Sequence, residues 1–501
     1  MTEITKRALL GAGGLLTLAA GAAQAADAPQ GGPFVTRHSG VFNGQKVDYV
    51  ATVGETVLTG ADGQATIRFV TTSYVKAGAD PKTRPVLFAF NGGPSSSSST
   101  LHMVALGPKR IVVEQDPKAP GLPPAMVDNT LTVLDVADIV FVDPAETGFT
   151  RILPGGKREV FYSIEGDSQS VSDFIVAWIK ANGREASPKY VLGESYGTQR
   201  AAFMAGQLAK TMPLDGVFLF GQAVNMIETS QRAKNAVSYA TNLPALTAIA
   251  AYHGKATAWK GKSTSQIVEE SYAFGMGEYL QALLQGYDLP AAKRKALADK
   301  LQAMTGISAA YYLANDLVIT KIAFATELFK SHAQMMGIYD ARYVGPMPQP
   351  GQRPVDPFGK ARGSIEPMVQ EHLAKNLGVT WPTSDYRSIA PGSNAWTWGG
   401  TLGPGGPFLD FDYPARIDAA FKANPNFRLM IGTGVFDLTT TAGPARYMVT
   451  KSDWPRERVF QRLYWGGHMA YTHAASHKAF CQDIRAWVSG GKPGAPQTLQ
   501  A

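Results

Sequence analysis

The chain has 501 residues, 45% of them hydrophobic and 17% charged, so it can bury a sizeable core in one large domain or in two or three smaller ones. This composition excludes a disordered or collagen-like chain. The net charge of +7 comes from scattered Lys and Arg with no run of five, which argues against nucleic acid as a partner. Cys481 is the only cysteine, so a disulfide within the chain is impossible and an inert buried thiol is expected.

The first residues have the pattern of a signal peptide. Lys6 and Arg7 precede an apolar run that ends at Ala20, and Ala23-Gln24-Ala25 offers a cleavage site of small residues. We therefore predict a signal peptide at residues 1–25 and an exported mature protein, periplasmic or secreted, with an uncleaved anchor as the alternative. No later stretch reaches about 18 uncharged apolar residues, so the mature chain is not expected to span a membrane.

The next part of the chain predicts strands. From His38 to Val75 apolar and polar residues alternate around Asn43-Gly44 and Asp62-Gly63, which is typical of antiparallel strands with tight turns. Short apolar runs follow, as expected for strands buried on both faces of a mostly parallel sheet. These runs are Pro85–Phe90, Asp138–Val142, Tyr190–Leu192 and Val217–Phe220. Between the second and the third, Ser170–Asp173 predicts a helix start, which gives an α/β order.

From residue 225 to 424 long helical patterns dominate, notably Ser265–Gln285 and Leu313–Lys330, and predict a mainly helical insertion over the sheet. The sheet resumes with Arg428–Ile431 and Val459–Trp465, and an amphipathic helix follows. The predicted division is a signal peptide (1–25), a first core part (26–224), the helical insertion (225–424), a second core part (425–492) and a tail (493–501).

Gly193-Glu194-Ser195-Tyr196-Gly197 has the form G-x-S-x-G. The pattern alone is weak, but here it follows a buried strand and precedes the helical pattern 199–205. This strand, sharp turn and helix lift a serine hydroxyl out of a sheet. Ser195 is therefore the predicted nucleophile.

A serine hydroxyl needs a base, and the base needs an orienting carboxylate. Asp437 follows the strand at Arg428–Ile431, and His468 follows the strand at Val459–Trp465 through a Gly-Gly turn. The order Ser, Asp, His on loops after strands predicts an α/β-hydrolase fold, with a mostly parallel central sheet flanked by helices. The predicted triad is Ser195, Asp437 and His468.

His473 and His477 are spaced i, i+4 and raise the question of a metal site with His468. No H-E-x-x-H pattern or nearby carboxylate supports one, so we expect these two histidines on a solvated helix face. No metal and no cofactor is expected.

Five segments resemble the serine carboxypeptidases, in order along the chain. They are Asn91–Ser98 (family Asn-Gly-Gly-Pro-Gly-x-Ser-Ser), Asp143–Thr150, Gly193–Gly197 (Gly-Glu-Ser-Tyr-Ala/Gly), Gly434–Asp437 and Gly467–Met469 (Gly-His-Met). The likeness is greatest to bacterial members. It implies that the backbone N–H groups of Gly93 and Tyr196 form the oxyanion hole. It also implies that Asn91, Glu194 and Met469 bind substrate, with Asn91 and a protonated Glu194 holding the peptide's terminal carboxylate.

The chain departs from this family at several positions, among them Ala145-Glu146 in place of a more usual Val-Gly. Ala89 replaces a Trp, Ser95 replaces a Gly, and Ala105 stands where the eukaryotic enzymes have a second Glu. The triad is unaffected, but we expect weaker recognition of a free carboxylate and acceptance of blocked C-termini.

The resemblance implies an exported serine carboxypeptidase that acts on peptides. An esterase, amidase or acyltransferase with the same triad, acting on small acyl substrates, is the first alternative. A catalytically silent binding protein is the second, and the intact Ser, Asp and His order argues against it. The sequence does not define the oligomeric state or the preferred side chain.

Overall fold

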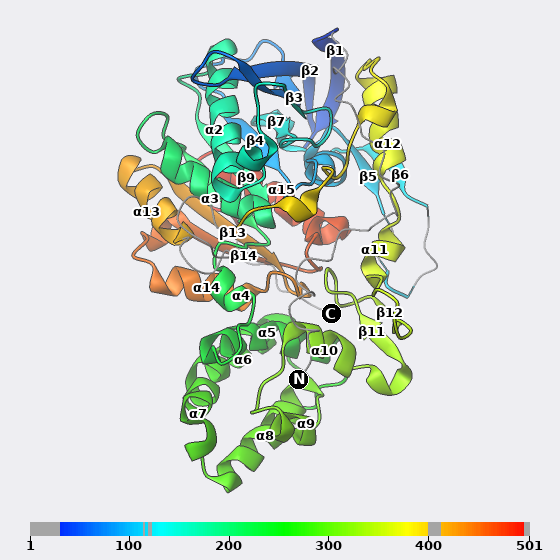
Figure 1. The fold of residues 1–501 in the computed structure, drawn as a ribbon, viewed down its shortest axis with the longest axis vertical. Coiled ribbons are helices and arrows are strands. Elements are labelled where there is room, and N and C mark those ends of the chain that lie inside the picture. Colours follow the sequence, from blue (N-terminus) through cyan, green and yellow to red (C-terminus); the bar gives the residue numbers. More distant parts are fainter. Residues whose placement is uncertain (1–30, 114–115, 119–122, 399–411, 495–501) are drawn as a thin grey trace.

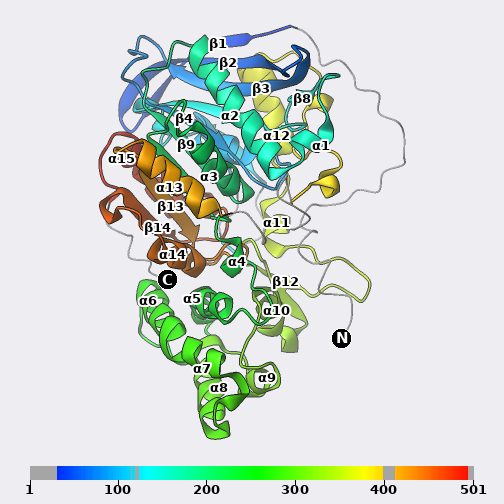
Figure 2. The same cartoon turned by 60° about the vertical axis from the view of Figure 1, so that its left-hand side comes forward.

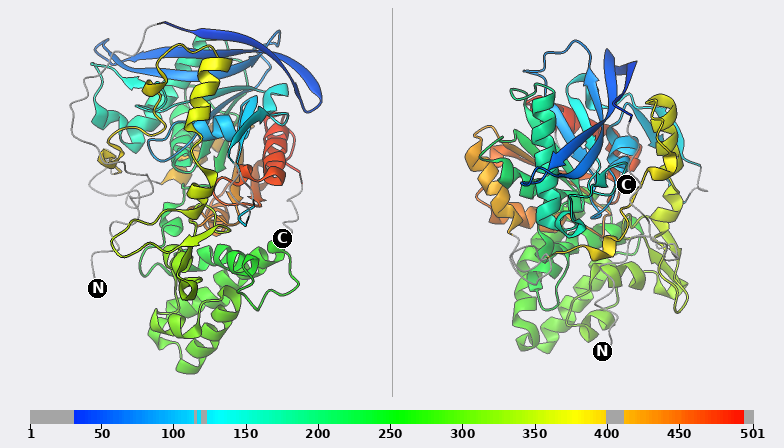
Figure 3. Two further views of the ribbon diagram at one scale, coloured as in Figure 1. Left: turned by 90° about the vertical axis from the view of Figure 1, so that its right-hand side faces the viewer. Right: turned by 45° about the horizontal axis from the view of Figure 1, so that its top comes forward.

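A computed structural model describes residues 31–113, 116–118, 123–398 and 412–494. The predicted signal peptide and most of the predicted tail lie outside these residues. The described part is an α/β domain from which a helical unit projects at one end (Figure 1). Two further orientations show the same division (Figures 2 and 3).

The central sheet has the strand order β1-β2-β3-β7-β4-β9-β10-β13-β14, and β8 pairs with β3. The strands from β7 to β14 in this order are parallel, whereas β1, β2 and β3 are antiparallel. The strands of the sheet are β1 (Phe34–Phe42), β2 (Gln45–Thr59), β3 (Ala65–Lys76), β4 (Val86–Phe90), β7 (Asp138–Val142), β8 (Arg151–Ile152), β9 (Lys189–Glu194), β10 (Gly216–Phe220), β13 (Arg428–Gly434) and β14 (Val459–Tyr464). Two small hairpins pair β5 (Lys109–Val112) with β6 (Ala125–Asp128) and β11 (Gln334–Met336) with β12 (Val344–Pro346).

Helices cover both faces of the sheet. Along β4, Val86, Phe88 and Phe90 pack into one buried cluster with α2, α3 and α13, while Leu87 and Ala89 pack into the other with α15 and η3. This alternation is the two-residue period of a strand. The helices of this domain are α1 (Arg158–Phe161), α2 (Ile164–Ala181), α3 (Tyr196–Leu208), α13 (Tyr413–Ala423), α14 (Ala442–Lys451), α15 (Ala474–Val488) and the π-helical η3 (Leu101–Leu106). The predicted α/β-hydrolase fold is confirmed.

The helical unit follows the carboxyl end of β10 and has its own buried cluster (green in Figure 1). Its helices are α4 (Met226–Thr229), α5 (Ala236–Tyr252), α6 (Thr264–Phe274), α7 (Leu280–Gln285), α8 (Ala291–Thr305), α9 (Ala309–Ala314) and α10 (Lys321–Glu327). After α11 (Pro357–Arg362) and α12 (Glu366–Glu371), Leu373, Trp381 and Tyr386 return to the core cluster of the sheet. The predicted insertion 225–424 therefore combines a separate helical unit with a segment that packs on the sheet.

Two helix predictions were wrong in detail. Helix α2 begins at Ile164, capped by the Ser163 hydroxyl, whereas Ser170 lies inside the helix and donates back to the Asp167 carbonyl. The pattern Leu313–Lys330 is not one helix, because Asp316 and Leu317 adopt positive φ between α9 and α10. No helix among the described residues is long and apolar enough to cross a bilayer.

Candidate active site

Ser195 lies at the turn between β9 and α3, as predicted. Its φ of 59° and ψ of −128° are costly for a residue with a side chain, and the turn persists because its surroundings enforce it. A Cβ on Gly193 would lie 2.1 Å from the Gly197 carbonyl oxygen, so only glycine fits at this position, two residues before the serine. The turn therefore has the strained strand-to-helix form that exposes a nucleophile.

The loop after β4 packs directly on this turn. A Cβ on Gly92 would lie 2.5 Å from the Tyr196 nitrogen, so the absence of a side chain lets the two backbones meet. Gly93 has φ +113°, and Ser95 has φ +74°, a conformation suited to the glycine found there in the family. The loop thus brings the Gly92 backbone against the Tyr196 N–H, and Gly93 is the next residue; an oxyanion hole formed by Gly93 and Tyr196 would require such an approach.

Asp437 and His468 come together at the carboxyl ends of β13 and β14. His468 Nδ1 lies 2.7 Å from Asp437 Oδ2, and both side chains are buried. The hydroxyls of Thr439 and Thr440 donate to the same carboxylate at 2.6 and 2.7 Å, and lie 2.8 and 3.1 Å from His468 Nδ1. Sequence reasoning missed both threonines, although their position just after Asp437 was a usable signal.

The charges of this pair stabilise each other. Burial alone would lower the pKa of His468, but the Asp437 carboxylate outweighs burial and raises it. Burial alone would raise the pKa of Asp437, but His468 and the two threonine hydroxyls outweigh burial and lower it. The pair therefore favours a charged imidazolium next to an ionised carboxylate, which is what a base needs while it holds a proton.

A short segment of the insertion, residues 338–342, connects the loops that carry Asp437 and His468. We call it the bridging segment. The Leu438 N–H donates to the Ile338 carbonyl at 3.0 Å, and the His468 N–H donates to the Tyr339 carbonyl at 2.5 Å. The Asp340 carboxylate accepts from the Gly467 N–H at 3.0 Å, and its partner Arg342 lies 2.6 Å away. Local sequence carries no signal for these contacts.

Ser195 and His468 lie on either side of the end of β10. The Ser195 N–H donates to the Phe220 carbonyl at 2.9 Å, and a Cβ on Gly221 would lie 2.9 Å from His468 Cε1. The two described side chains, Ser195 and His468, are not hydrogen-bonded to each other. In free enzymes this contact often tightens only with substrate.

The predicted substrate-binding residues lie around this centre. Asn91 is buried, and its Oδ1 accepts from the Leu101 N–H at 2.9 Å, which leaves the amide nitrogen as the group that can donate to a ligand. Glu194 is buried and accepts from the Tyr471 hydroxyl at 2.5 Å. Met469 is partly buried against the core. Sequence reasoning missed Tyr471, three residues after His468.

The prediction that His473 and His477 lie on a solvated face was wrong for His477. This side chain is fully buried, and its Nε2 lies 2.7 Å from the Ala105 carbonyl oxygen. Burial holds the pKa of His477 at about 4. Cys481 is buried, as predicted, and burial raises the pKa of its thiol to about 12. No group of three or more potential metal ligands occurs within the described ranges.

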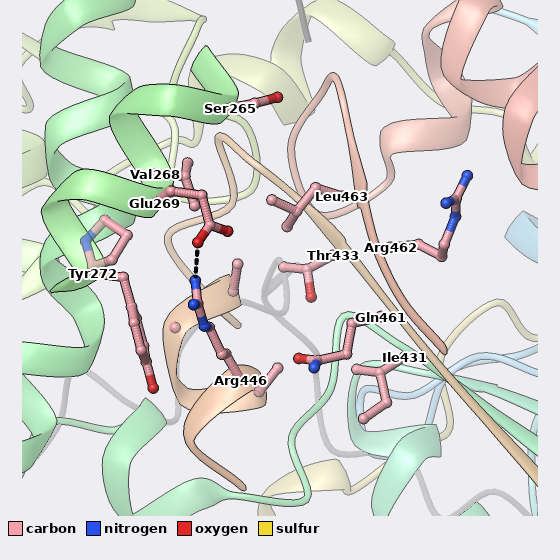
Figure 4. Close-up of a pocket in the computed structure, with 14 residues that line it drawn as sticks. Ser265, Val268, Glu269, Tyr272, Ile431, Thr433, Arg446, Gln461, Arg462 and Leu463 are labelled. Carbon is pink, nitrogen blue, oxygen red and sulfur yellow. Dashed lines mark hydrogen bonds and ion pairs between the residues drawn. The ribbon is translucent and has the colours of Figure 1, made fainter. Parts of the chain in front are cut away.

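A cavity of about 340 Å³ lies elsewhere, between α5 and α6 of the insertion and strands β13 and β14 (Figure 4). Glu269 and Arg446 point toward each other across it and form an ion pair at 2.7 Å. None of the predicted site residues lines this cavity.

Solved structures similar to this chain include a proline iminopeptidase of Mycobacterium smegmatis and an epoxide hydrolase of Aspergillus niger. The first has 15% sequence identity and a TM-score of 0.37, and the alignment covers 87% of this chain and 98% of the iminopeptidase chain. The second has 11% identity and a TM-score of 0.37, and the alignment covers 88% of this chain and 78% of the epoxide hydrolase chain. At these scores the assignment of the α/β-hydrolase class rests on the strand order and the elbow of this chain.

Residues 72–224 match the family model described as serine carboxypeptidase. Serine carboxypeptidase-like 16 of Arabidopsis thaliana is 32% identical over 128 residues, which are 25% of this chain and 28% of that protein. Serine carboxypeptidase-like 15 of the same plant is 31% identical over the same shares. Through this segment the chain is similar to the serine carboxypeptidase family. The chain matches little more than a quarter of the length of these relatives, and the bacterial branch stays a prediction.

Proposed function

We propose that this chain is an exported serine-type carboxypeptidase that hydrolyses C-terminal peptide bonds through an acyl-enzyme on Ser195. The observation that carries the proposal is the Asp437–His468 pair at 2.7 Å, placed across the end of β10 from the strained Ser195. The match of residues 72–224 to the serine carboxypeptidase family model, which includes the loop of Asn91 and Gly93, supports it. The predicted signal peptide supports export to the periplasm or the medium.

In this proposal His468 Nε2 takes the Ser195 proton as the Ser195 oxygen bonds to the scissile carbonyl carbon. The N–H groups of Gly93 and Tyr196 stabilise the oxyanion. The imidazolium then returns the proton to the leaving amine, and the C–N bond breaks. Water, deprotonated by His468, releases the acyl group and regenerates Ser195. Asp437 holds the imidazole in the correct tautomer throughout.

Hydrolysis or transfer of small acyl compounds is the second candidate function. The observation that favours it is the hydrogen bond from the Tyr471 phenol to Glu194, while position 105 is an alanine. A phenol donor stabilises a charged carboxylate, and a charged Glu194 would repel a substrate carboxylate. A silent binding protein is less favoured, because such a protein needs no paired Asp437 and His468.

A fluorophosphonate probe tests the nucleophile. We expect it to label the wild type and to fail on Ser195→Ala, and we expect turnover by that variant to fall by about a millionfold. Equal labelling of Ser195→Ala would assign the nucleophile to another residue.

Substrate competition separates the two candidate functions. Products from a mixed peptide library are identified by mass spectrometry beside a panel of simple esters, and kcat/KM is compared for a free C-terminus and its amide. Preference for the free acid above about a hundredfold, worth about 2.7 kcal/mol, supports the carboxypeptidase. A smaller preference favours the acyl alternative.

A further inference from the structure

The insertion places a lysine against the catalytic aspartate loop. Lys321 is the first residue of α10, and only 6% of it is exposed. Lysine is almost never buried to this degree without a partner. Figures 1 and 2 place α10 on the side of the helical unit nearest the sheet, with α8 further away.

The partner of Lys321 is the aspartate loop itself. Its Nζ donates to the Thr439 carbonyl at 2.8 Å. Thr439 in turn donates its N–H and its hydroxyl to Asp437 Oδ1, both at 2.6 Å, and its hydroxyl lies 2.8 Å from His468 Nδ1. One residue therefore separates the ammonium group from the predicted acid–base pair.

The backbone of Lys321 is held in place independently. Its N–H donates to Gln231 Oε1 at 2.6 Å, and the Thr320 hydroxyl accepts from the Ala323 N–H to start the helix. These contacts fix the Lys321 backbone, so the position of its side chain against Thr439 does not depend only on the hydrogen bond from the ammonium group.

The charged groups around His468 come from several elements. Asp437 and Glu194 both raise the pKa of His468, whereas Lys321 lowers it. Asp340 and Arg342 of the bridging segment face the histidine loop as a closed ion pair. Burial lowers the pKa of Lys321 to about 8, and the Asp437 charge opposes this effect. At neutral pH Lys321 is therefore mostly a cation, facing Asp437.

We propose that Lys321 is a positioning residue for the triad. Lys321 holds the Thr439 carbonyl and offsets part of the Asp437 charge, so that His468 is a neutral base at lower pH. The inference rests on the proposed function only in that Ser195, Asp437 and His468 act together. It does not depend on the substrate class.

The rate constant for labelling of Ser195 by a fluorophosphonate, measured from pH 5 to 9, tests this proposal without a substrate. Wild type is compared with Lys321→Met and Lys321→Gln, and with the exposed Lys330→Met as a matched control. In both Lys321 variants the acid limb should move to higher pH by roughly half to one pH unit, and the control should leave it unchanged. At pH 6 this corresponds to labelling slower by about threefold to tenfold.

Thermal stability separates positioning from a purely structural role. The folded pKa of Lys321 lies below that of an unfolded lysine, so the cation costs stability at neutral pH. Neither variant should therefore lower the melting temperature by more than a few degrees. If Lys321→Met fails to fold, Lys321→Gln, which keeps a donor without the charge, carries the test. An unmoved acid limb in a folded Lys321→Gln would overturn the proposal. No labelling of the wild type at any pH would instead overturn the proposed function.

Discussion

The two halves of the candidate site are built in different ways. The nucleophile half, formed by the Asn91 loop and the Ser195 elbow, lies within the segment that matches the family model, although residues 388–390 also hydrogen-bond to the Asn91 loop. The buried Arg200 donates to the Asn91 carbonyl at 2.9 Å and pairs with Asp167 at 2.7 Å. These contacts join the loop after β4 to α2 and α3, which pack on the same face of the sheet.

The acid–base half, formed by Asp437 and His468, depends on the insertion. The bridging segment contacts both of its loops and Lys321 contacts the aspartate loop, and all of these residues lie beyond the matched segment. The nucleophile half is recognisable because its glycine loop and elbow are continuous sequence motifs, whereas the contacts that support Asp437 and His468 come from separate segments with no local sequence signal. The variants below test this division, in order of falling effect.

Replacing Asp437 by Asn tests the acid–base half directly. We expect turnover to fall on the order of ten-thousandfold, because the imidazole loses its correct tautomer. Circular dichroism should be unchanged, since the amide keeps the shape of the side chain. Asp410 and Asp412, which precede β13 in the sequence, are the alternative carboxylates. Asp410 lies outside the described residues, and Asp412 caps α13. Full activity in the variant would reassign the orienting role to one of them.

What the sequence could predict follows the same division. The buried strands and the elbow were predictable because an apolar run indicates a buried strand and closely spaced glycines indicate a tight turn, without reference to the rest of the chain. The break at Asp316 and Leu317 was not predictable, because a tertiary contact holds it, the Tyr279 hydroxyl donating to the Leu317 carbonyl at 2.8 Å. The burial of His477 and the roles of Tyr471 and Lys321 also depend on residues far away in the chain.

Removing Asp340 should affect stability and turnover together. In Asp340→Ala the buried Arg342 loses its partner, which should cost about 3 kcal/mol of unfolding free energy. Turnover by the folded protein should also fall by roughly a hundredfold, because the histidine loop loses its anchor. The matched control is Asp483→Ala, which breaks the buried pair with Arg462 between α15 and β14. An equal loss of turnover in both variants would show that the bridging segment has no special role.

Acid should act on stability through buried histidines of opposite sign. His102 of η3 and His372 both contact Tyr74, and burial holds the pKa of His372 at about 4 and that of His102 well below its usual value. The unfolded chain then binds more protons below pH 6.5, so stability falls on acidification. The raised pKa of His468 has the opposite sign, because its contribution is complete below pH 6.5 and is lost as pH rises through the folded value.

Urea unfolding at pH 7 and pH 5 measures this difference. We expect His372 alone to contribute about 2 kcal/mol to the loss of stability between these values. His372→Gln should remove that share of the pH dependence, and the exposed His332→Gln should not. An unchanged pH dependence in His372→Gln would show that this histidine does not titrate on unfolding.

The smallest effect is expected where the insertion meets the sheet domain at the surface. Glu269 of α6 and Arg446 of α14 form an ion pair at 2.7 Å, with side chains 63% and 40% exposed (Figure 4). Solvent screens such a pair, so Glu269→Gln should change the unfolding free energy by less than about 1 kcal/mol. Arg446 also keeps its position over the Tyr272 ring, 4.2 Å from the centroid. The pH profile of Ser195 labelling should match the wild type, unlike that of the buried Lys321 variants, because Lys321 hydrogen-bonds directly to the aspartate loop. A loss above about 2 kcal/mol, or a shifted profile, would mean that this exposed pair also positions the acid–base half.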